Sequence, residues 1–174
     1  LDPITCGEGI QQDVSSLLYE PLFCLNEQFE SSPLLCEGAQ WDETGLVCTL
    51  YVRQGVLFSD GSELTAADVA ATLRRAVESK RYAYRLRKVA DISYSNRNKT
   101  VTVTLTEKNS AFLSLLDISV VKKGTENQMV PIGTGPYLYV TTEDGVQLIA
   151  NNEWWQQKAL PVDTIKLVHA KDED

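Results

Sequence analysis

The sequence predicts an α+β fold, with a mixed, mostly antiparallel, twisted sheet and helices packed on it. Alternating apolar segments occur in adjacent pairs joined by short turns. Helical segments interrupt these pairs without the regular strand-helix alternation that would indicate a parallel sheet. The length of 174 residues and the 43% share of hydrophobic residues suit one globular unit, so we expect residues 1–174 to form a single domain.

The first helix is predicted at residues 10–19, where Ile10 begins an apolar stripe at helical spacing. It should end just before the proline that follows, because proline cannot continue a helix. A short apolar strand is predicted at 21–26. A longer strand at 45–55 alternates between apolar and polar side chains, as a half-buried strand does.

The clearest element is a helix at 66–79. Thr65 suits the N-cap position, and Asp68 stands three residues later, which is the spacing of a capping box. Apolar residues recur along the helix on one face, and this face should pack on the sheet. The residues on that face are Val69, Leu73 and Val77.

The second half of the chain predicts two hairpins and a last strand. The first hairpin joins strands at 89–96 and 99–107, and the second covers 135–152 with its turn at 143–145. Between the hairpins, an apolar run at 110–117 predicts a short helix. A final strand is expected at 162–170.

Four cysteines permit either free thiols or two disulfides in three pairings: Cys6, Cys24, Cys36 and Cys48. No Cys-x-x-Cys spacing occurs, which argues against a zinc site. Cys48 has the parity of Leu50 and Val52 in its strand. We therefore predict that Cys48 is buried and reduced.

The charge balance restricts the classes of partner. Sixteen basic residues against 24 acidic ones give a formal charge of −8, which argues against a nucleic-acid partner. No apolar run approaches the roughly 18 residues of a membrane span. The chain starts at Leu1 without a methionine, so the lack of a leader peptide says nothing about its compartment.

Residues 133–137, Gly-Thr-Gly-Pro-Tyr, form the most conspicuous glycine-rich segment. A phosphate-binding loop would need a lysine and a following helix, whereas a proline and a strand follow here. We therefore expect Gly133 and Gly135 to adopt positive φ angles and to let the neighbouring backbone approach at close range.

No recognisable catalytic machinery is present. The only histidine is His169, near the end of the chain. An enzymatic alternative would pair Cys36 or Cys48 with His169, but nothing in the sequence brings these residues together. We expect no catalytic residue, no metal site and no cofactor.

Five segments in order resemble the extracytoplasmic solute-binding proteins of family 5, the oligopeptide/dipeptide type. They are "LDP" with "LYEPL", "LYVRQGVLFSDGSELTAADVAATLRRA", "TVTVTLTEKNSAFLSLL", "PIGTGPYLYV" and "NNEWW", with Trp154 where the family usually has tyrosine. Members of that family have two lobes that enclose a ligand. The resemblance covers only the N-terminal part of the first lobe, so the second lobe is expected to lie outside this chain.

The resemblance also implies a binding site. In peptide-binding members the loop after the Leu-Asp-Pro opening borders the ligand, and exposed glycine backbone there can pair with a peptide as an added strand. The Gly-Thr-Gly-Pro-Tyr segment lies where the first lobe turns toward the cleft. The implied ligand-binding residues are Gly7, Glu8, Gly9, Gly133, Thr134, Gly135 and Tyr137.

By this resemblance, the expected function is capture of oligopeptides or dipeptides for an ABC importer, without catalysis. The partners would be the solute and the membrane permease, and the place extracytoplasmic, with a lipid anchor outside this chain. One alternative is a binder of nickel chelate or another small solute on the same scaffold. Another, from a different class, is a stand-alone secreted interaction domain.

Overall fold

The strands form three separate antiparallel sheets in the computed structural model, which describes residues 1–168. The helices are α1 (Ile10–Leu18), α2 (Ala66–Glu78) and the 3-10 helix η1 (Phe112–Leu115). The strands are β1 (Phe23–Leu25), β2 (Ser31–Pro33), β3 (Cys36–Trp41), β4 (Val47–Val52), β5 (Val89–Ser95), β6 (Thr100–Leu105), β7 (Tyr137–Thr142), β8 (Gly145–Ala150) and β9 (Thr164–Leu167). The predicted α+β class and the antiparallel pairing are confirmed, although three sheets replace the single expected one.

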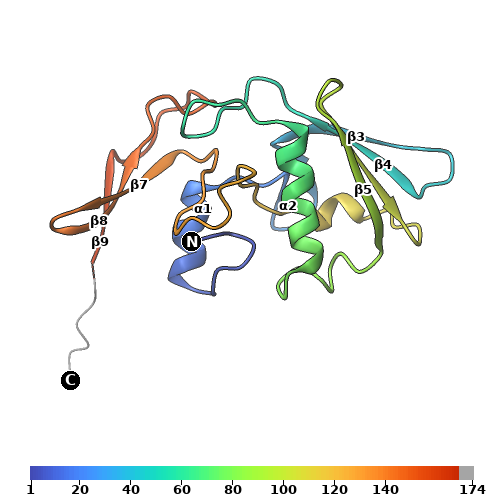
Figure 1. Ribbon diagram of the computed structural model, residues 1–174, viewed down its shortest axis with the longest axis horizontal. Helices are drawn as coiled ribbons and strands as arrows, with labels where there is room; N and C mark the ends of the chain where they lie inside the picture. The colour runs from blue at the N-terminus through green and yellow to red at the C-terminus, as the bar shows by residue number, and fades with distance from the viewer. Residues whose placement is uncertain (169–174) are drawn as a thin grey trace.

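The largest sheet has the strand order β3-β4-β6-β5, and α2 packs against it (Figure 1). Its two central strands, β4 and β6, alternate between fully buried and half-buried residues. The buried residues of both strands belong to one hydrophobic cluster that also includes residues of α2. We call this set of buried residues, which extends from Leu22 to Val120 and includes Ile4, the large cluster.

The α2 helix begins as the sequence predicts. The Thr65 hydroxyl accepts a hydrogen bond from the Asp68 N–H at 3.2 Å, and the Asp68 carboxylate accepts one from the Thr65 N–H at 2.9 Å. These two bonds form the capping box and satisfy N–H groups that a helix otherwise leaves free. Val69 and Leu73 are buried against the sheet, and Val77 is half-buried beside them.

The three-stranded sheet β7-β8-β9 lies at the other end of the elongated molecule, with α1 between it and α2 (Figure 1). A second hydrophobic cluster joins this sheet to α1, and we call it the small cluster. Its buried members are Val14, Leu18, Tyr19, Val121, Tyr137 and Leu148.

Two of the segments in which the chain crosses between the clusters, near Pro21 and near Ser119, run side by side. The Leu22 N–H donates to the Ile118 carbonyl at 3.2 Å, and the Val120 N–H donates to the Glu20 carbonyl at 3.1 Å. These bonds pair the crossings as a short antiparallel ribbon, whose bridge is Pro21 with Ser119.

Several predictions need correction. Ile10 is 68% exposed and lies outside the buried face of α1. The short apolar helix is a 3-10 helix rather than an α-helix. Strands β2 and β3 were not predicted, because all three residues of β2 are exposed and β3 carries a bulge near Gly38 that breaks its alternation. His169 lies outside the described residues.

Both cysteines of the large cluster are buried free thiols, as predicted for Cys48. Burial raises the pKa of the Cys48 thiol to about 11 and that of the Cys36 thiol to about 12. Cys6 and Cys24 are half-buried and also unpaired. The thiols of the large cluster are therefore protonated at neutral pH and poorly nucleophilic.

Candidate functional site

The opening turn of the chain is fixed to α2. The Asp2 carboxylate accepts a hydrogen bond from the Ile4 N–H at 3.0 Å and forms an ion pair with Arg75 on α2. The Asp2 carbonyl accepts two further bonds, from the N–H groups of Thr5 and Cys6. Because Ile4 is also buried in the large cluster, the start of the following loop is firmly anchored.

Beyond this anchor, residues 7–9 form an exposed loop that leads into α1. Gly9 is the N-cap of α1 with a φ of 73°, a conformation that other residues rarely adopt. The Gly7 N–H donates to the Gln11 side chain at 3.0 Å. Glu8 forms no ion pair or side-chain hydrogen bond within the described part of the chain, so its carboxylate is available to a ligand.

This loop lines a cavity of about 530 Å³ together with the residues that follow α2. The loop contributes residues 4–8, α1 contributes Gln12, and the segment after α2 contributes residues 79–81. The cavity therefore combines the Glu8 carboxylate with the cations Lys80 and Arg81. Its volume lies within the range of small-molecule sites, about 300–1,000 Å³.

Arg81 is the central side chain of this region. Its guanidinium donates to the Cys6 sulfur at 3.7 Å and lies 5.4 Å from the centre of the Tyr82 ring. Among residues 1–168, no carboxylate lies within ion-pairing distance of it. An exposed guanidinium without a carboxylate partner is well suited to receive an anionic group.

A second cavity of about 290 Å³ adjoins the first and shares Arg81 and Gln12 with it. Its other polar lining includes Ser15, Tyr19 and Asp117. Side chains of both charge signs therefore line one continuous region along α1. We call the two cavities together the α1 site.

The Gly-Thr-Gly-Pro-Tyr segment lies at the opposite end of α1 from the loop. The nine residues of α1 separate the two by about 13 Å, because an α-helix rises about 1.5 Å per residue. Gly133, Thr134 and Gly135 are buried. A Cβ on Gly133 would overlap the Tyr19 ring, and a Cβ on Gly135 would overlap the backbone of Leu18.

The close approach expected of these glycines is confirmed, whereas the positive φ angles are not found. The Gly135 N–H donates to the Leu18 carbonyl at 2.9 Å. The Tyr137 hydroxyl donates to the Val162 carbonyl at 2.9 Å. Gly133 and Tyr137 line a separate cavity of about 150 Å³. The segment thus seats the C-terminal end of α1 and does not line the α1 site.

Glu20 connects this segment to the end of the "NNEWW" segment, residues 151–155. Its buried carboxylate accepts hydrogen bonds from Thr134 Oγ1 at 2.8 Å, Trp155 Nε1 at 2.6 Å and Gln156 Nε2 at 2.6 Å. All three donors are neutral. Burial raises the pKa of the Glu20 carboxyl, and these hydrogen bonds lower it in part.

Sequence reasoning predicted part of this site. Gly7 and Glu8 line the α1 site, and Gly9 is the N-cap of α1 beside it. Lys80 and Arg81, which also line the site, were not predicted. The basic run from Lys80 to Lys88 in an acidic chain is a signal that could have drawn attention to them. Among residues 1–168, no cluster of metal-binding side chains occurs, and no helix is long and apolar enough to cross a membrane.

Comparison with known proteins places these features in a family. Residues 30–174 match the bacterial extracellular solute-binding proteins, family 5 (middle). The glutathione-binding protein GsiB of Salmonella paratyphi A is 32% identical over 178 residues, which cover 95% of this chain and 35% of the relative. The chain thus spans about a third of the length of the curated relatives it matches.

Solved structures show the same fold. NikZ from Campylobacter jejuni, in complex with Ni(L-His), has a TM-score of 0.71 at 25% identity, with 89% of this chain and 34% of that chain covered. The oligopeptide-binding protein AppA from Bacillus subtilis, in complex with a nonapeptide, has a TM-score of 0.74 at 22% identity, with 90% and 35% covered. On these matches of sequence and fold, the chain belongs to the bacterial extracellular solute-binding proteins of family 5.

Proposed function

We propose that this chain forms one wall of a peptide-binding site in the solute-binding component of an ABC importer. The observation that carries the proposal is the α1 site, where two adjoining cavities share an arginine that has no carboxylate partner among residues 1–168. The site offers hydrogen bonds and charge. Binding there is non-covalent, and the solute is released unchanged.

The charges of the α1 site suit a zwitterion. Arg81 and Lys80 would receive a carboxylate of the peptide, and Glu8 or Asp117 an ammonium group. The exposed backbone at Gly7 and Gly9 admits a peptide main chain at close range. The relatives named for glutathione and for a nonapeptide support a peptide as the solute class.

The Gly-Thr-Gly-Pro-Tyr segment has a supporting role in this proposal. Gly133, Thr134, Gly135 and Tyr137 would keep α1 in place, so that the loop at its other end meets Arg81. Direct contact between these four residues and a ligand stays a prediction. Their burial in the small cluster and at the Glu20 carboxylate favours the supporting role.

The proposed partner is the membrane permease, which would receive the solute on the outer side of the membrane. The family description as extracellular supports this location. A lipid anchor outside this chain stays a prediction. Capture would require a second wall to close over the ligand, because a cleft protein gains affinity by surrounding its solute.

The test is a titration of the 174-residue chain with glutathione and with trialanine, followed by amide chemical shifts. One wall retains about half the contacts, so we expect millimolar affinity where an intact site would reach about 1 μM. The shifts should fall on residues 4–12 and 79–81. Arg81→Gln should weaken binding about tenfold, because a charge-assisted hydrogen bond is lost.

Arg97→Gln is the matched control, since it removes the same charge from an exposed turn between β5 and β6. It should leave the titration unchanged. Equal binding by parent and Arg81→Gln would exclude the α1 site, and micromolar binding would exclude the one-wall argument. A response to Ni(L-His) but to neither peptide would favour the metal-chelate alternative, which the structural similarity to NikZ supports.

A further inference from the structure

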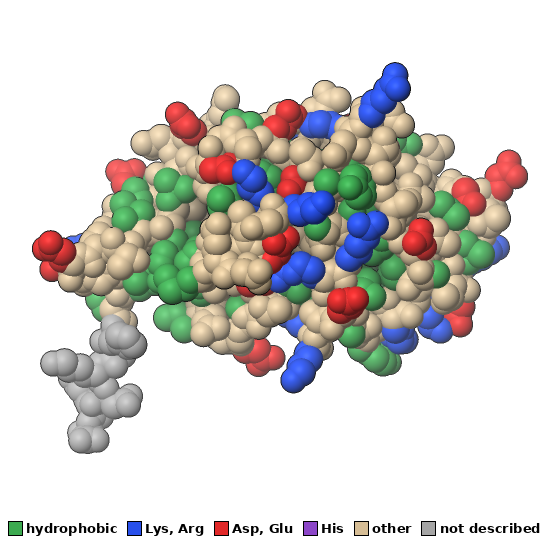
Figure 2. Space-filling model, in the orientation of Figure 1, with side chains coloured by type: hydrophobic (Ala, Val, Ile, Leu, Met, Phe, Trp, Pro, Cys, Tyr) green, Lys and Arg blue, Asp and Glu red, His purple; other side chains and the backbone are tan. Residues whose placement is uncertain are grey.

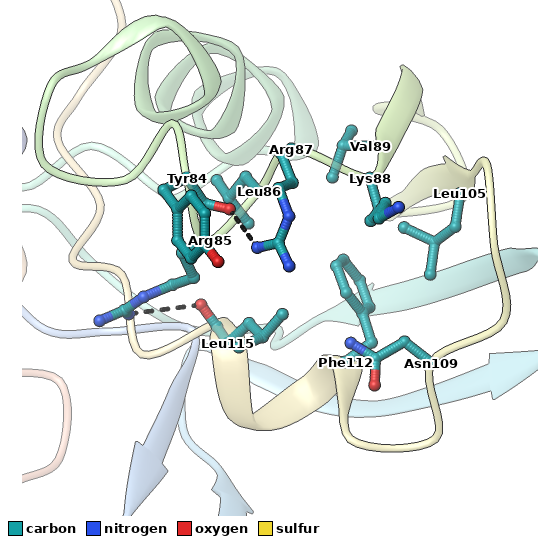
Figure 3. Close-up of a pocket in the computed structure, with 10 residues that line it drawn as sticks. All are labelled: Tyr84, Arg85, Leu86, Arg87, Lys88, Val89, Leu105, Asn109, Phe112 and Leu115. Atoms are coloured by element: carbon teal, nitrogen blue, oxygen red, sulfur yellow. Dashed lines mark hydrogen bonds between the residues drawn. The ribbon is translucent and has the colours of Figure 1, made fainter.

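A fourth cavity, of about 380 Å³, lies beside the segment that follows α2 and shares no lining residue with the α1 site (Figure 3). The segment between α2 and β5 forms one wall. The end of β6 and the helix η1 form the other. This cavity is comparable in volume with the smaller ligand sites of proteins.

The floor of the cavity is apolar and made of buried side chains. Leu86, Leu105 and Phe112 are each no more than 3% exposed and belong to the large cluster. Phe112 and Trp41 form a T-shaped aromatic pair, with ring centres 5.9 Å apart and an interplanar angle of 72°. An apolar body that enters this cavity would therefore meet side chains that are already fixed in position.

The rim carries three cationic side chains, and they differ in whether they are paired and in where they point. Lys88 is paired with Glu107 at 2.7 Å. The Arg85 guanidinium is directed away from the cavity, toward the Leu115 carbonyl at 3.5 Å (Figure 3). Arg87 projects between Tyr84 and Phe112 toward the middle of the cavity (Figure 3).

Among residues 1–168, Tyr84 holds Arg87 in this orientation. It donates one bond to the Tyr84 carbonyl at 2.8 Å, and its guanidinium lies 4.1 Å from the centre of the Tyr84 ring. Within residues 1–168, no carboxylate lies at ion-pairing distance from Arg87. Its remaining N–H donors are free to bind an anion.

Asn109 adds a neutral donor on the opposite side of the rim. Its Oδ1 accepts a hydrogen bond from the Ala111 N–H at 3.0 Å. The amide orientation is thereby fixed, and the Nδ2 group remains as a donor beside the cavity.

We propose that this cavity is a second ligand site, which binds a small organic anion with one carboxylate on an apolar body. The carboxylate would bind Arg87 and Asn109, and the apolar body would rest on Phe112, Leu105 and Leu115. One available cation matches one negative charge. The absence of a carboxylate from the lining disfavours a zwitterion, in contrast to the α1 site.

The experiment uses 3-phenylpropionate as the probe, with 3-phenylpropionamide as its uncharged counterpart and acetate as the anion without an apolar body. Amide chemical shifts locate binding, and tryptophan fluorescence follows it through Trp41 against Phe112. We expect 3-phenylpropionate to bind saturably with a Kd of about 1 mM, and both comparison compounds to bind at least about tenfold more weakly.

Arg87→Gln should weaken 3-phenylpropionate binding about tenfold, while Arg97→Gln should change it less than about twofold. Arg87 is exposed and outside the core, so its replacement should not unfold the chain. Shifts confined to residues 84–89 and 105–115 would support the proposal. Shifts confined to the α1 site, equal binding by Arg87→Gln, equal binding of the amide, or no saturable binding at millimolar concentration would each overturn it.

Discussion

The two hydrophobic clusters differ in how completely they are enclosed. In the large cluster, β4 and β6 are the inner strands of their sheet, and every second residue in them is fully buried. In the small cluster, β7 and β8 each have one buried residue, and β9 has none. Figure 2 shows hydrophobic side chains at the surface between this sheet and α1.

We infer from this difference that the large cluster mainly determines stability and that the small cluster mainly determines the geometry of the binding site. The α1 site lies on the boundary of the two clusters, with Arg81 supplied by the segment after α2 and the loop supplied by the start of α1. The large cluster should therefore dominate the free energy of unfolding. The small cluster holds α1, so it should mainly control the position of the loop at residues 7–9 relative to Arg81.

The same truncation in the two clusters is the strongest test of this comparison. Leu73→Ala, in the large cluster, should lower the free energy of unfolding by about 2–5 kcal/mol, because it removes buried methyl groups and leaves a cavity. Leu148→Ala, in the small cluster, should lie near the lower end of that range, because its half-buried neighbours can move to fill the space. Urea denaturation measures both, and equal losses would remove the distinction.

Gly135→Ala should have the next largest effect. Its new Cβ would overlap the Leu18 backbone, and the forced shift should cost about 1–3 kcal/mol. Hydrogen exchange should increase in β7 and β8 more than in β4 and β6. Gly38→Ala is the control, because nothing lies within 4 Å of its Cβ position. Exchange that rises equally in both sheets would argue against separate clusters.

The pH dependence of stability should report the raised pKa of the Glu20 carboxyl. Burial raises the pKa of the Glu20 carboxyl, so between its ordinary and raised pKa values the folded chain binds more protons than the unfolded chain. The free energy of unfolding contributed by this group therefore falls as the pH rises through that window. Glu20→Gln cannot ionise, and the Gln156 amide can rotate to keep a hydrogen bond with it.

Urea denaturation at several pH values would check this sign. The stability of Glu20→Gln relative to the parent should increase as the pH rises through the window between the ordinary and the raised pKa of the Glu20 carboxyl. A difference that is constant with pH, or that decreases, would show that Glu20 titrates normally.

Thiol labelling should distinguish the buried cysteines of the large cluster from the two half-buried cysteines, and it requires no substitution. Cys36 and Cys48 are buried in the large cluster, and burial raises the pKa values of their thiols to about 12 and about 11. Iodoacetamide at pH 8 should modify Cys6 in the folded chain, Cys24 more slowly because burial also raises the pKa of its thiol, and all four thiols in urea. Complete labelling of the folded chain would show that the large cluster opens readily.

Much of the fold was predictable because local chemistry dictates it. The capping box of α2, the parity of Cys48 and both hairpins follow from residues close together in the sequence. The division into three sheets was not predictable, since it depends on which strands meet after the chain crosses between the clusters. Arg81 was missed for a similar reason, because its contact with Cys6 spans 75 positions.

The paired crossings at Glu20 and Val120 have a consequence for the order of folding. The large cluster draws almost entirely on residues 22–120, whereas the small cluster joins residues 14–19 to residues 121–148. Closing a loop of that length from an open chain costs roughly 4 kcal/mol of entropy. Once the large cluster has formed, the paired crossings already hold the two segments together, so the small cluster assembles as a nearly local step and is the later one.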